Sequence, residues 1–566
     1  MNPAANRAPY LTPIRCRDRP SVLVLVALVL GLTLGALSRA TAAPGPDELL
    51  RDAESALGNR DLSGAAAAFT AAAEASPEVT VAERATQFTF GAGFDALAER
   101  AVSRWVALAP ENPLPRELLG RLKLRRHAVD EATVELLAAL GPGEPRRDEV
   151  YLALASDLSS EDNAGLVTRT LARLTALDPL APGLQLALGT AALRSGDYEL
   201  AMGAAETAAL DDPEWPEPQL LMARALAASG REDEALAKVA AISAAAPNPL
   251  IDLEYARLLA DTGKVEEARE KLAELTVLFG DRPEINRTLA FLDLATGNLD
   301  GADQRFDALD DSGADRFESF YYRAQIAAQR GDPEGARRYL GRISSGPYLV
   351  PAQLGIAQSL VQAGEPGQAV EHLTAFGFDH PARAYDVLEY KAQILQVMKR
   401  PDEALAVYAE ALQYKPTAIP VLLSRGALLE QEGRIREALA DLERAVKIAP
   451  DDPLAANAYG YILANRTRQA RKAWVYVRRA YEIQPRSAPI QDSVGWTLFK
   501  LGRVQEARSH LEEALDRLPD PEIASHLADV LWKLGDRDAA TELLMSAAAA
   551  YPDSAPVRDT AERLLR

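Results

Sequence analysis

Apolar residues recur along most of this chain at helical spacing, as pairs of stripes separated by a short turn. In the stretch 488–521 the two stripes are Val494, Gly495 and Leu498, then Ala507, Leu511 and Ala514. Spacings of three and four residues place such side chains on one face of a helix. Gly502 lies between the stripes and suits the left-handed residue that ends a helix. Each such stretch therefore predicts two amphipathic helices joined by a turn.

This two-helix unit repeats about every 34 residues, a period typical of repeat architectures. Proline recurs at Pro416, Pro450, Pro485, Pro519 and Pro552, and an alanine precedes each by the same interval (Ala404, Ala438, Ala473, Ala507 and Ala540). A weaker form of the pattern continues upstream, giving about fifteen units between residues 46 and 554. Small residues at fixed positions allow the paired helices to approach closely, and proline sets the length of each unit.

Such units predict an all-α fold, because no single unit buries both of its stripes. Successive units must stack into an α-solenoid with a continuous core. We expect degenerate repeats over 43–181, regular repeats over 182–554 and an amphipathic cap helix over 555–566. Nearly every residue after the leader is assigned to a repeat, so no separate catalytic domain is expected.

The segment 1–42 has the features of a secretory signal peptide. Arg15, Arg17 and Arg19 precede the uncharged stretch 22–37, and Ala40-Thr41-Ala42 follows as a small-x-small cleavage site. We therefore expect an exported, periplasmic protein. The apolar stretch is shorter than the roughly 20 residues that span a bilayer, although an uncleaved leader could still tether the chain. Cys16 precedes the apolar stretch, so the leader contains no lipobox.

Composition narrows the function classes. The chain has 566 residues and a formal net charge of -20, which argues against a nucleic-acid partner. Cys16 is its single cysteine, so disulfide frameworks and thiolate metal sites are not expected.

The five histidines are His127, His372, His380, His510 and His526. None has the spacing of a metal site, and we expect them at surface or edge positions. No phosphate-binding glycine loop or nucleophile motif is present. The sequence predicts no enzyme, cofactor or metal.

The positions of the small residues, alanines and prolines resemble the tetratricopeptide repeat. The resemblance is strong over 182–554 and looser over 46–181. It implies a right-handed superhelix whose first helices line the concave side.

Three segments are similar to a narrower group, the LbcA-type periplasmic repeat proteins: 457–467, 492–502 and 519–527. Members of that group are lipoproteins that act as adaptors for a carboxyl-terminal processing protease, which degrades cell-wall cross-link hydrolases. The resemblance implies the same partners here. This chain differs from the group because it lacks the lipidated cysteine.

Aromatic, amide and carboxylate side chains interleave on the expected concave face near the C-terminus. The candidate partner-binding residues are Asn457, Tyr461, Asp492, Ser493, Trp496, Phe499, His526, Asp529 and Trp532. Rigid aromatic anchors with polar neighbours are typical of protein interfaces. In an alternative interpretation, Trp496 and Trp532 simply pack between adjacent units.

Two function hypotheses remain from these observations. The first is a scaffold or adaptor in the bacterial cell envelope that presents protein substrates to a protease. The second is a structural component of machinery for envelope polymer export or cytochrome assembly. A repeat-bearing glycosyltransferase would need an additional sugar-nucleotide domain, for which the repeats leave no room.

Overall fold

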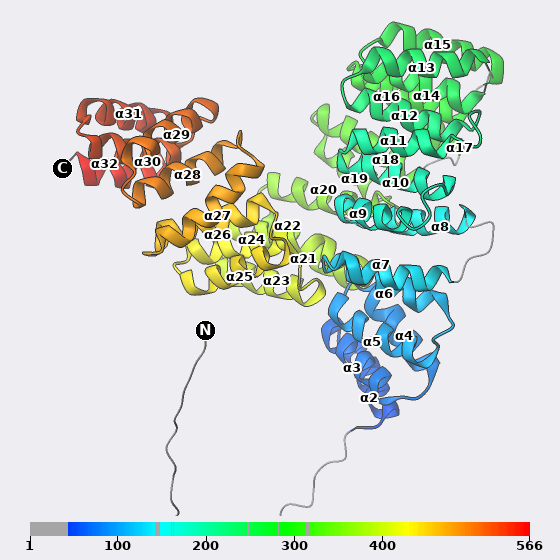
Figure 1. Ribbon diagram of the computed structural model, residues 1–566, viewed down its shortest axis with the longest axis horizontal. Helices are drawn as coiled ribbons and strands as arrows, with labels where there is room; N and C mark the ends of the chain where they lie inside the picture. The colour runs from blue at the N-terminus through cyan, green and yellow to red at the C-terminus, as the bar shows by residue number, and fades with distance from the viewer. Residues whose placement is uncertain are drawn as a thin grey trace, which may run out of the picture.

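The computed structural model describes residues 44–141, 148–159, 161, 163–245, 248–280, 282–312 and 316–565 (Figure 1). These residues form 31 α-helices and one short 3-10 helix, without a strand in the described part of the chain. The all-helical solenoid expected from the sequence is confirmed. The predicted leader, 1–42, lies outside the described residues, so its assignment as a signal peptide stays a prediction.

The described helices form three parts of the chain. The N-terminal block consists of α2 (Pro46–Gly58), α3 (Leu62–Ala75), α4 (Val79–Gly91), α5 (Asp95–Leu108), α6 (Pro113–Arg125) and α7 (Val129–Leu140). The middle repeats begin with α8 (Asp148–Ser159), α9 (Ala164–Thr175), α10 (Pro182–Ser195), α11 (Tyr198–Ala208), α12 (Pro216–Ala228), α13 (Glu232–Ala245), α14 (Pro249–Asp261), α15 (Val265–Phe279), α16 (Pro283–Ala295) and α17 (Leu299–Ser312).

The middle repeats continue with α18 (Arg316–Gln329), α19 (Pro333–Leu340), α20 (Leu349–Gln362), α21 (Pro366–Asp379), the 3-10 helix η1 (Pro381–Arg383), α22 (Tyr385–Val397), α23 (Pro401–Tyr414), α24 (Ile419–Gln431) and α25 (Ile435–Ile448). The C-terminal arm consists of α26 (Pro453–Arg466), α27 (Ala470–Ile483), α28 (Ala488–Lys500), α29 (Val504–Arg517), α30 (Pro521–Leu534), α31 (Arg537–Ala550) and α32 (Ala555–Leu564).

Helices α2 to α31 follow one another as fifteen pairs, each an even-numbered first helix and an odd-numbered second helix. Most pairs pack closely against each other, whereas α8 packs more on α10 than on α9. The small residues of the sequence pattern lie at the crossings of the paired helices. A Cβ atom added at Gly495 would come within 2.5 Å of Leu511 Cγ and 3.2 Å of the Ala507 carbonyl oxygen. The spacing of the small residues is therefore a packing requirement.

In the C-terminal arm the first helices lie on the inside of the curve. Helix α28 contacts both α26 and α30, whereas α27, α29 and α31 contact one another less. Helix α32 packs on α30 and α31 and buries Val557 over the last repeat. The division of the chain at residue 181 stays a prediction.

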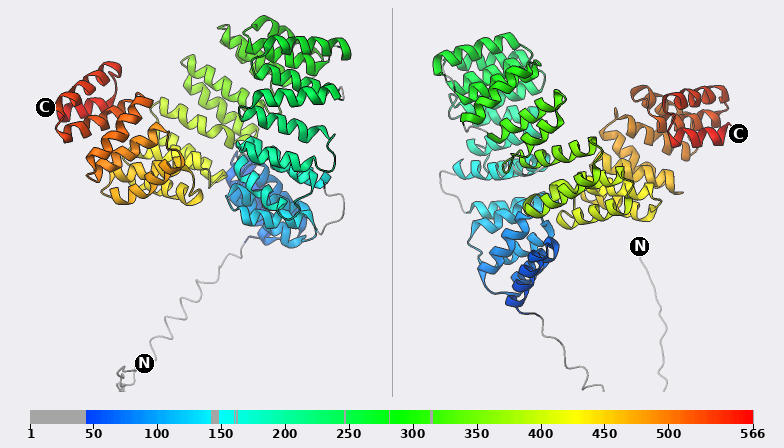
Figure 2. Two further views of the ribbon diagram at one scale, coloured as in Figure 1. Left: turned by 45° about the horizontal axis from the view of Figure 1, so that its top comes forward. Right: turned by 180° about the vertical axis from the view of Figure 1, so that it is seen from behind.

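The solenoid bends so far that the N-terminal block meets the middle repeats again, at α21 to α25 (Figures 1 and 2). We call this junction the seam. The rings of Phe94 and Tyr414 stack there with centroids 4.1 Å apart, and the two side chains are only 1% and 3% exposed. Ser63 Oγ donates a hydrogen bond to Gln413 Oε1 at 2.9 Å, and Thr417 Oγ1 donates to the carbonyl oxygen of Arg125 at 3.2 Å. Segments far apart in sequence thus share one core.

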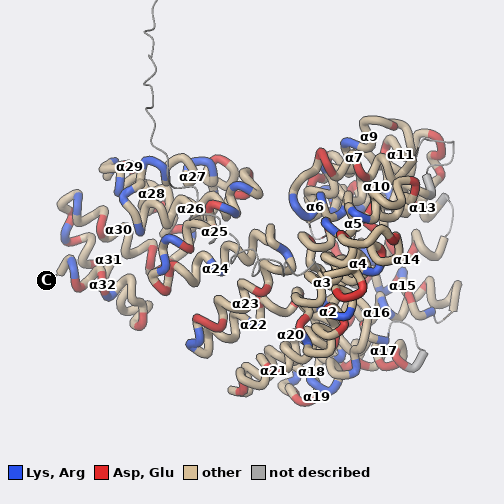
Figure 3. The backbone as a smooth tube through the Cα atoms, turned by 90° about the horizontal axis from the view of Figure 1, so that it is seen from below, with Lys and Arg blue, Asp and Glu red and all other residues tan. Residues whose placement is uncertain are grey.

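The C-terminal arm extends away from this closed part and carries the C-terminus at its far end (Figure 1). Lys and Arg are interspersed with Asp and Glu along both parts of the chain (Figure 3). Within the described ranges, no helix is both long and apolar enough to cross a bilayer.

Candidate partner-binding site

The candidate site lies on the first helices of the C-terminal arm, where equivalent positions of successive repeats face one another. Helix α28 contributes Asp492 and Trp496, and α30 contributes His526 and Asp529. The interval between Asp492 and His526 is 34 residues, which is one repeat. The repeat length therefore aligns these positions across neighbouring units.

Trp496 and His526 form the centre of the site. Their rings stack with centroids 4.0 Å apart and an interplanar angle of 16°, and each side chain is 6% exposed. His526 Nδ1 lies 2.8 Å from Asp492 Oδ1. The ring of Phe499 stacks on Trp496 with centroids 5.3 Å apart, and Lys500 Nζ lies 4.1 Å from the centroid of the indole. The indole is thus held by ring and cation contacts from its own helix and from the next repeat.

Hydrogen bonds extend the site to the preceding repeat. Trp496 Nε1 donates to Asn465 Oδ1 at 3.2 Å, and Asn465 Nδ2 donates to the Tyr461 hydroxyl oxygen at 3.1 Å. The Tyr461 hydroxyl in turn donates to the carboxylate of Glu522. Tyr461 is on α26 and Glu522 is on α30, so this bond passes over α28. Three successive repeats are linked on their inner side.

Arg563 connects the site to the last helix. Its guanidinium forms two hydrogen bonds with the Asp529 carboxylate, at 2.6 and 2.8 Å. Asp529 is nearly buried, and the bidentate pairing compensates its charge. Helix α32 therefore contributes a polar contact to the inner face.

Burial and neighbouring charges shift the pKa of His526 in opposite directions. Burial of the imidazole alone would lower its pKa, but the Asp492 carboxylate, together with Glu522 and Asp529, raises the pKa above the ordinary value of 6.5. Burial and the adjacent Glu522 carboxylate raise the pKa of Tyr461, so its hydroxyl remains a donor at neutral pH. Burial lowers the pKa of Lys500, partly offset by Asp529.

The remaining candidate residues are less closely connected to this network. The hydroxyl of Ser493 is buried and donates to the Pro489 carbonyl oxygen of its own helix at 3.0 Å. Asn457 is half-buried, and its Oδ1 atom is enclosed without a hydrogen-bond partner among the described residues. Trp532 is half-buried beneath the guanidinium of Arg537, 5.0 Å from the ring centroid.

One expectation from the sequence is wrong. The spacing of the histidines predicts a surface or edge position for His526, but this side chain is buried. The Trp496 ring covers it and the Asp492 carboxylate compensates its polarity, and neither contact is visible in the spacing of the histidines alone.

Four residues of the site were not predicted: Asn465, Lys500, Glu522 and Arg563. The interval from Asp529 to Arg563 is 34 residues, so the repeat length alone could have indicated that pair. Lys500 lies one turn after Trp496 on the same helix face. The bond from Tyr461 to Glu522 spans almost two repeats and depends on the curvature of the arm, which no local signal encodes.

Chemically, the site is a rigid polar and aromatic surface. Its buried carboxylates, Asp492 and Asp529, are paired with the basic side chains His526 and Arg563, because buried polar groups need hydrogen-bond partners. Across the described ranges, no three His, Cys, Asp or Glu side chains gather as metal ligands would. Tyr461, Phe499 and Trp532 are half-buried, so part of each side chain stays accessible to solvent.

This chain is similar to known repeat proteins. A curated TPR repeat-containing protein of Pseudomonas aeruginosa is 28% identical over 205 residues. The aligned region makes up 36% of this chain and about a third (35%) of that relative.

Similar solved structures include the APC/C hetero-tetramer Cut9-Hcn1, which is 15% identical, covers 95% of this chain and 99% of its own, and has a TM-score of 0.34. The type IV pilus biogenesis factor PilW is 19% identical, covers 38% and 99%, and has a TM-score of 0.32. A thermophilic TPR protein from Thermus thermophilus is 24% identical, covers 32% and 100%, and has a TM-score of 0.30.

Models of the tetratricopeptide repeat match residues 192–262, 319–342, 354–419, 398–473 and 498–564. These matches include most of the C-terminal arm. They also include the middle-repeat helices α21 to α25, which meet the N-terminal block at the seam. The resemblance to the tetratricopeptide repeat inferred from the sequence is thereby confirmed: the helix pairs of this chain include tetratricopeptide repeats.

Proposed function

We propose that this chain is a non-enzymatic adaptor that binds protein partners on the inner face of its C-terminal arm. The proposal rests mainly on the network that joins Tyr461, Trp496 and His526 across three repeats. Because these side chains are already fixed by stacking and hydrogen bonds, a partner would lose little of its binding free energy to ordering them. The half-exposed rings of Phe499 and Trp532 then serve as contact surface.

The cellular setting is part of the same proposal. The leader supports export to the periplasm, and the segments 457–467, 492–502 and 519–527 resemble those of adaptors for a carboxyl-terminal processing protease. We propose such a protease and its cell-wall hydrolase substrates as the partners. By tethering enzyme and substrate to one chain, the adaptor raises their effective concentration and itself carries out no bond chemistry.

Two tryptophans of the arm allow a matched test. Trp532, on α30, and Trp474, on α27, are both half-buried, and each has an arginine guanidinium over its ring, at 5.0 and 5.5 Å from the centroid. Trp532 belongs to a first helix and Trp474 to a second helix. Their truncations therefore each remove one half-buried indole, from a first helix and from a second helix respectively.

We expect Trp532→Ala to reduce recovery of partner proteins in a crosslinking pull-down from intact envelopes, whereas Trp474→Ala retains it. A processing protease should be among the proteins recovered with the unmodified chain. Equal recovery with both variants would contradict the placement of the site on the inner face. Recovery of export or cytochrome-assembly proteins without any protease would instead support the second function, a structural component of such machinery.

A further inference from the structure

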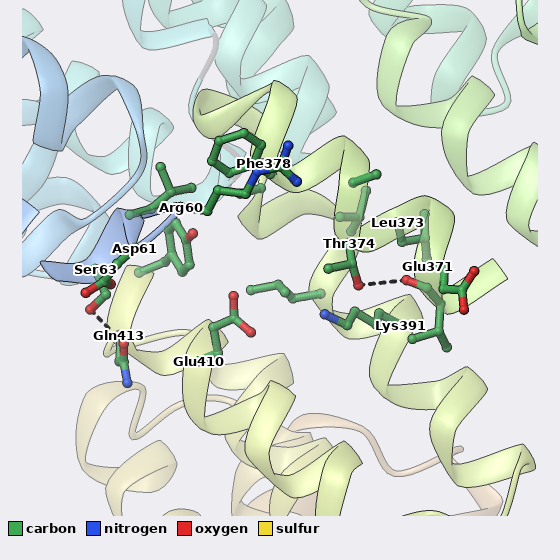
Figure 4. Close-up of a pocket in the computed structure, with 18 residues that line it drawn as sticks. Arg60, Asp61, Ser63, Glu371, Leu373, Thr374, Phe378, Lys391, Glu410 and Gln413 are labelled. Atoms are coloured by element: carbon green, nitrogen blue, oxygen red, sulfur yellow. Dashed lines mark hydrogen bonds between the residues drawn. The ribbon is translucent and has the colours of Figure 1, made fainter. Parts of the chain in front are cut away.

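A cavity of about 610 Å³ lies at the seam, between the turn that joins α2 to α3 and the helices α21, α22 and α23 (Figure 4). Its wall is largely apolar: Leu62, Val370, Leu373, Phe378, Leu388 and Tyr414. This volume and this type of lining are typical of small-ligand sites, in which an apolar wall carries a few polar groups that fix orientation.

Two opposite charges face this cavity from the middle repeats. Lys391 extends from α22 and Glu410 from α23, and Figure 4 shows both side chains pointing into the space. Both are half-buried, and neither forms an ion pair or hydrogen bond with a described residue. Half-buried charges normally acquire partners, because incomplete solvation is costly. The cavity therefore offers one half-buried cation and one half-buried anion over an apolar wall. Three exposed charged residues, Arg60, Asp61 and Glu371, complete its lining.

The N-terminal block supplies the remaining wall through a strained turn. Arg60 has φ 62°, in the left-handed region where most other repeats of this chain use glycine, and its guanidinium lies 4.2 Å from the centroid of the Phe378 ring. Next to it, Ser63 is hydrogen-bonded to Gln413. Strained residues of this kind persist where the surrounding structure fixes them, often at binding sites. The cavity is complete only while the seam is closed.

We propose that this seam cavity binds the carboxy-terminal residue of a polypeptide that ends in an apolar side chain. The terminal carboxylate pairs with Lys391, a backbone N–H of the ligand donates to Glu410, and the apolar side chain contacts Phe378 and Leu388. A phosphorylated ligand fits less well because Glu410 and Asp61 line the same space. A purely apolar ligand would leave both charges unpaired.

Binding at this position also stabilises the closed solenoid. The turn from Arg60 to Ser63 supplies the wall of the cavity on the N-terminal side. A ligand that fills the cavity therefore binds the closed form better than an open one and shifts the population toward closure. The cavity is formed by the α2–α3 turn and by α21, α22 and α23, none of which is altered by Trp532→Ala on α30. The two proposals therefore fail or succeed independently.

The test is calorimetric titration of the full-length protein with acetyl-Ala-Ala-Phe and with its C-terminal amide. We expect the free acid to bind, and amidation to weaken binding about tenfold or more, as loss of a charge-assisted hydrogen bond does. In Lys391→Met the acid should bind as weakly as the amide does to the unmodified protein, and amidation should cause no further loss. Lys391→Arg should retain the preference for the acid.

Lys533→Met is the matched control, because Lys533 is an exposed lysine on α30, away from the cavity. It should bind both peptides as the unmodified protein does. The proposal is overturned if neither peptide binds at millimolar concentration, if both bind equally well, or if Lys391→Met still prefers the acid. Circular dichroism of each variant establishes that the helices are retained.

Discussion

The seam and the C-terminal arm are built from the same helix pairs but held together in different ways. In the arm, contacts join neighbouring repeats: Asp492 with His526 and Asp529 with Arg563 are both 34 residues apart. At the seam, Phe94 at the start of α5 stacks on Tyr414 at the end of α23. Contacts of the first kind follow from the repeat length. Those of the second kind depend on the accumulated curvature of every repeat between them.

Packing differs between the regions as well. Four cavities of about 550 to 650 Å³ lie along the seam, each lined by residues from both sides. The arm instead has glycines pressed against neighbouring helices, with the added Cβ of Gly460 only 2.5 Å from Val477 Cγ2. A loosely packed joint opens with less loss of contact than a tightly packed repeat does. The seam is therefore the part of the closed solenoid that we expect to separate first.

The largest effect is expected from Phe94→Asp. An unpaired carboxylate within the aromatic stack is incompatible with the closed seam, so the N-terminal block should undock while its helices remain folded. Small-angle X-ray scattering should record a larger radius of gyration, and circular dichroism should record an unchanged helical content. Tyr476→Asp alters a half-buried aromatic ring of the arm and should leave the overall dimensions unchanged. If both variants keep the native dimensions, the seam does not depend on this stack.

Within the arm, Gly495→Ala should lower the free energy of unfolding by about 1 to 3 kcal/mol, because the new methyl group overlaps Leu511. The same change at Gly203, whose added Cβ meets nothing within 4 Å, is the control and should be neutral or stabilising. Thermal denaturation of the two variants measures the difference. Equal stability would indicate that the helices of the pair can move apart at no cost.

Two histidines of the arm should make the stability of the fold depend on pH with opposite signs. The pKa of His526 is raised, so its stabilisation is fully present below about pH 6.5 and is lost as the pH rises through the pKa of the folded state. Burial lowers the pKa of His510, with the Glu513 and Glu506 carboxylates opposing and Arg503 reinforcing the shift. Its effect is the reverse, and stability is gained as the pH rises through about 6.5.

Imidazole titration by NMR measures both pKa values directly, and hydrogen exchange of α28 and α30 follows the stability of the arm with pH. Asp492→Asn removes the carboxylate that faces His526 and should bring its pKa down while leaving that of His510 in place. The charged and titratable groups Glu522, Asp529, Tyr461, Lys500 and Arg563 remain around His526 in that variant. A His526 pKa below 6.5 in the unmodified protein would contradict the pairing with Asp492.

The smallest effect is expected at a helix cap. The Asp520 carboxylate accepts hydrogen bonds from the backbone N–H groups of Glu522 and Ile523, at 2.8 and 3.2 Å. Asp520→Ala should destabilise the arm by about 1 kcal/mol, as measured by denaturant unfolding, and Asp520→Asn should restore most of this loss. An unchanged midpoint for the alanine variant would show that water replaces the cap.

The sequence was informative where the structure is periodic. The small residues and prolines predicted the helix pairs, and the repeat positions indicated that Asp492 and His526 share the concave face. The seam had no such signal, because Phe94 and Tyr414 have the spacing of ordinary core aromatics within their own repeats. Arg60 stands where most repeats have glycine, but His127 and Lys399 do so as well, so this departure from the pattern does not by itself indicate a distant contact.

The exposure of the candidate residues could be predicted only in part, for a related reason. Repeat positions show which side chains share the inner face, but not how far that face is already filled by its own side chains. Trp496 is nearly buried by His526 and Phe499, whereas Trp532 keeps part of its ring accessible. This distinction depends on side-chain packing across the curve, which the repeat pattern does not specify.

The most direct test of the closed solenoid is a distance measured across the seam. Ser103 and Arg444 line one cavity from its two sides, and Cys16 is the single native cysteine, so spin labels at Ser103→Cys and Arg444→Cys in a Cys16→Ser background report this joint alone. Pulsed electron resonance should give one narrow, short distance that lengthens in Phe94→Asp. A broad or long distribution in the unmodified seam would contradict closure.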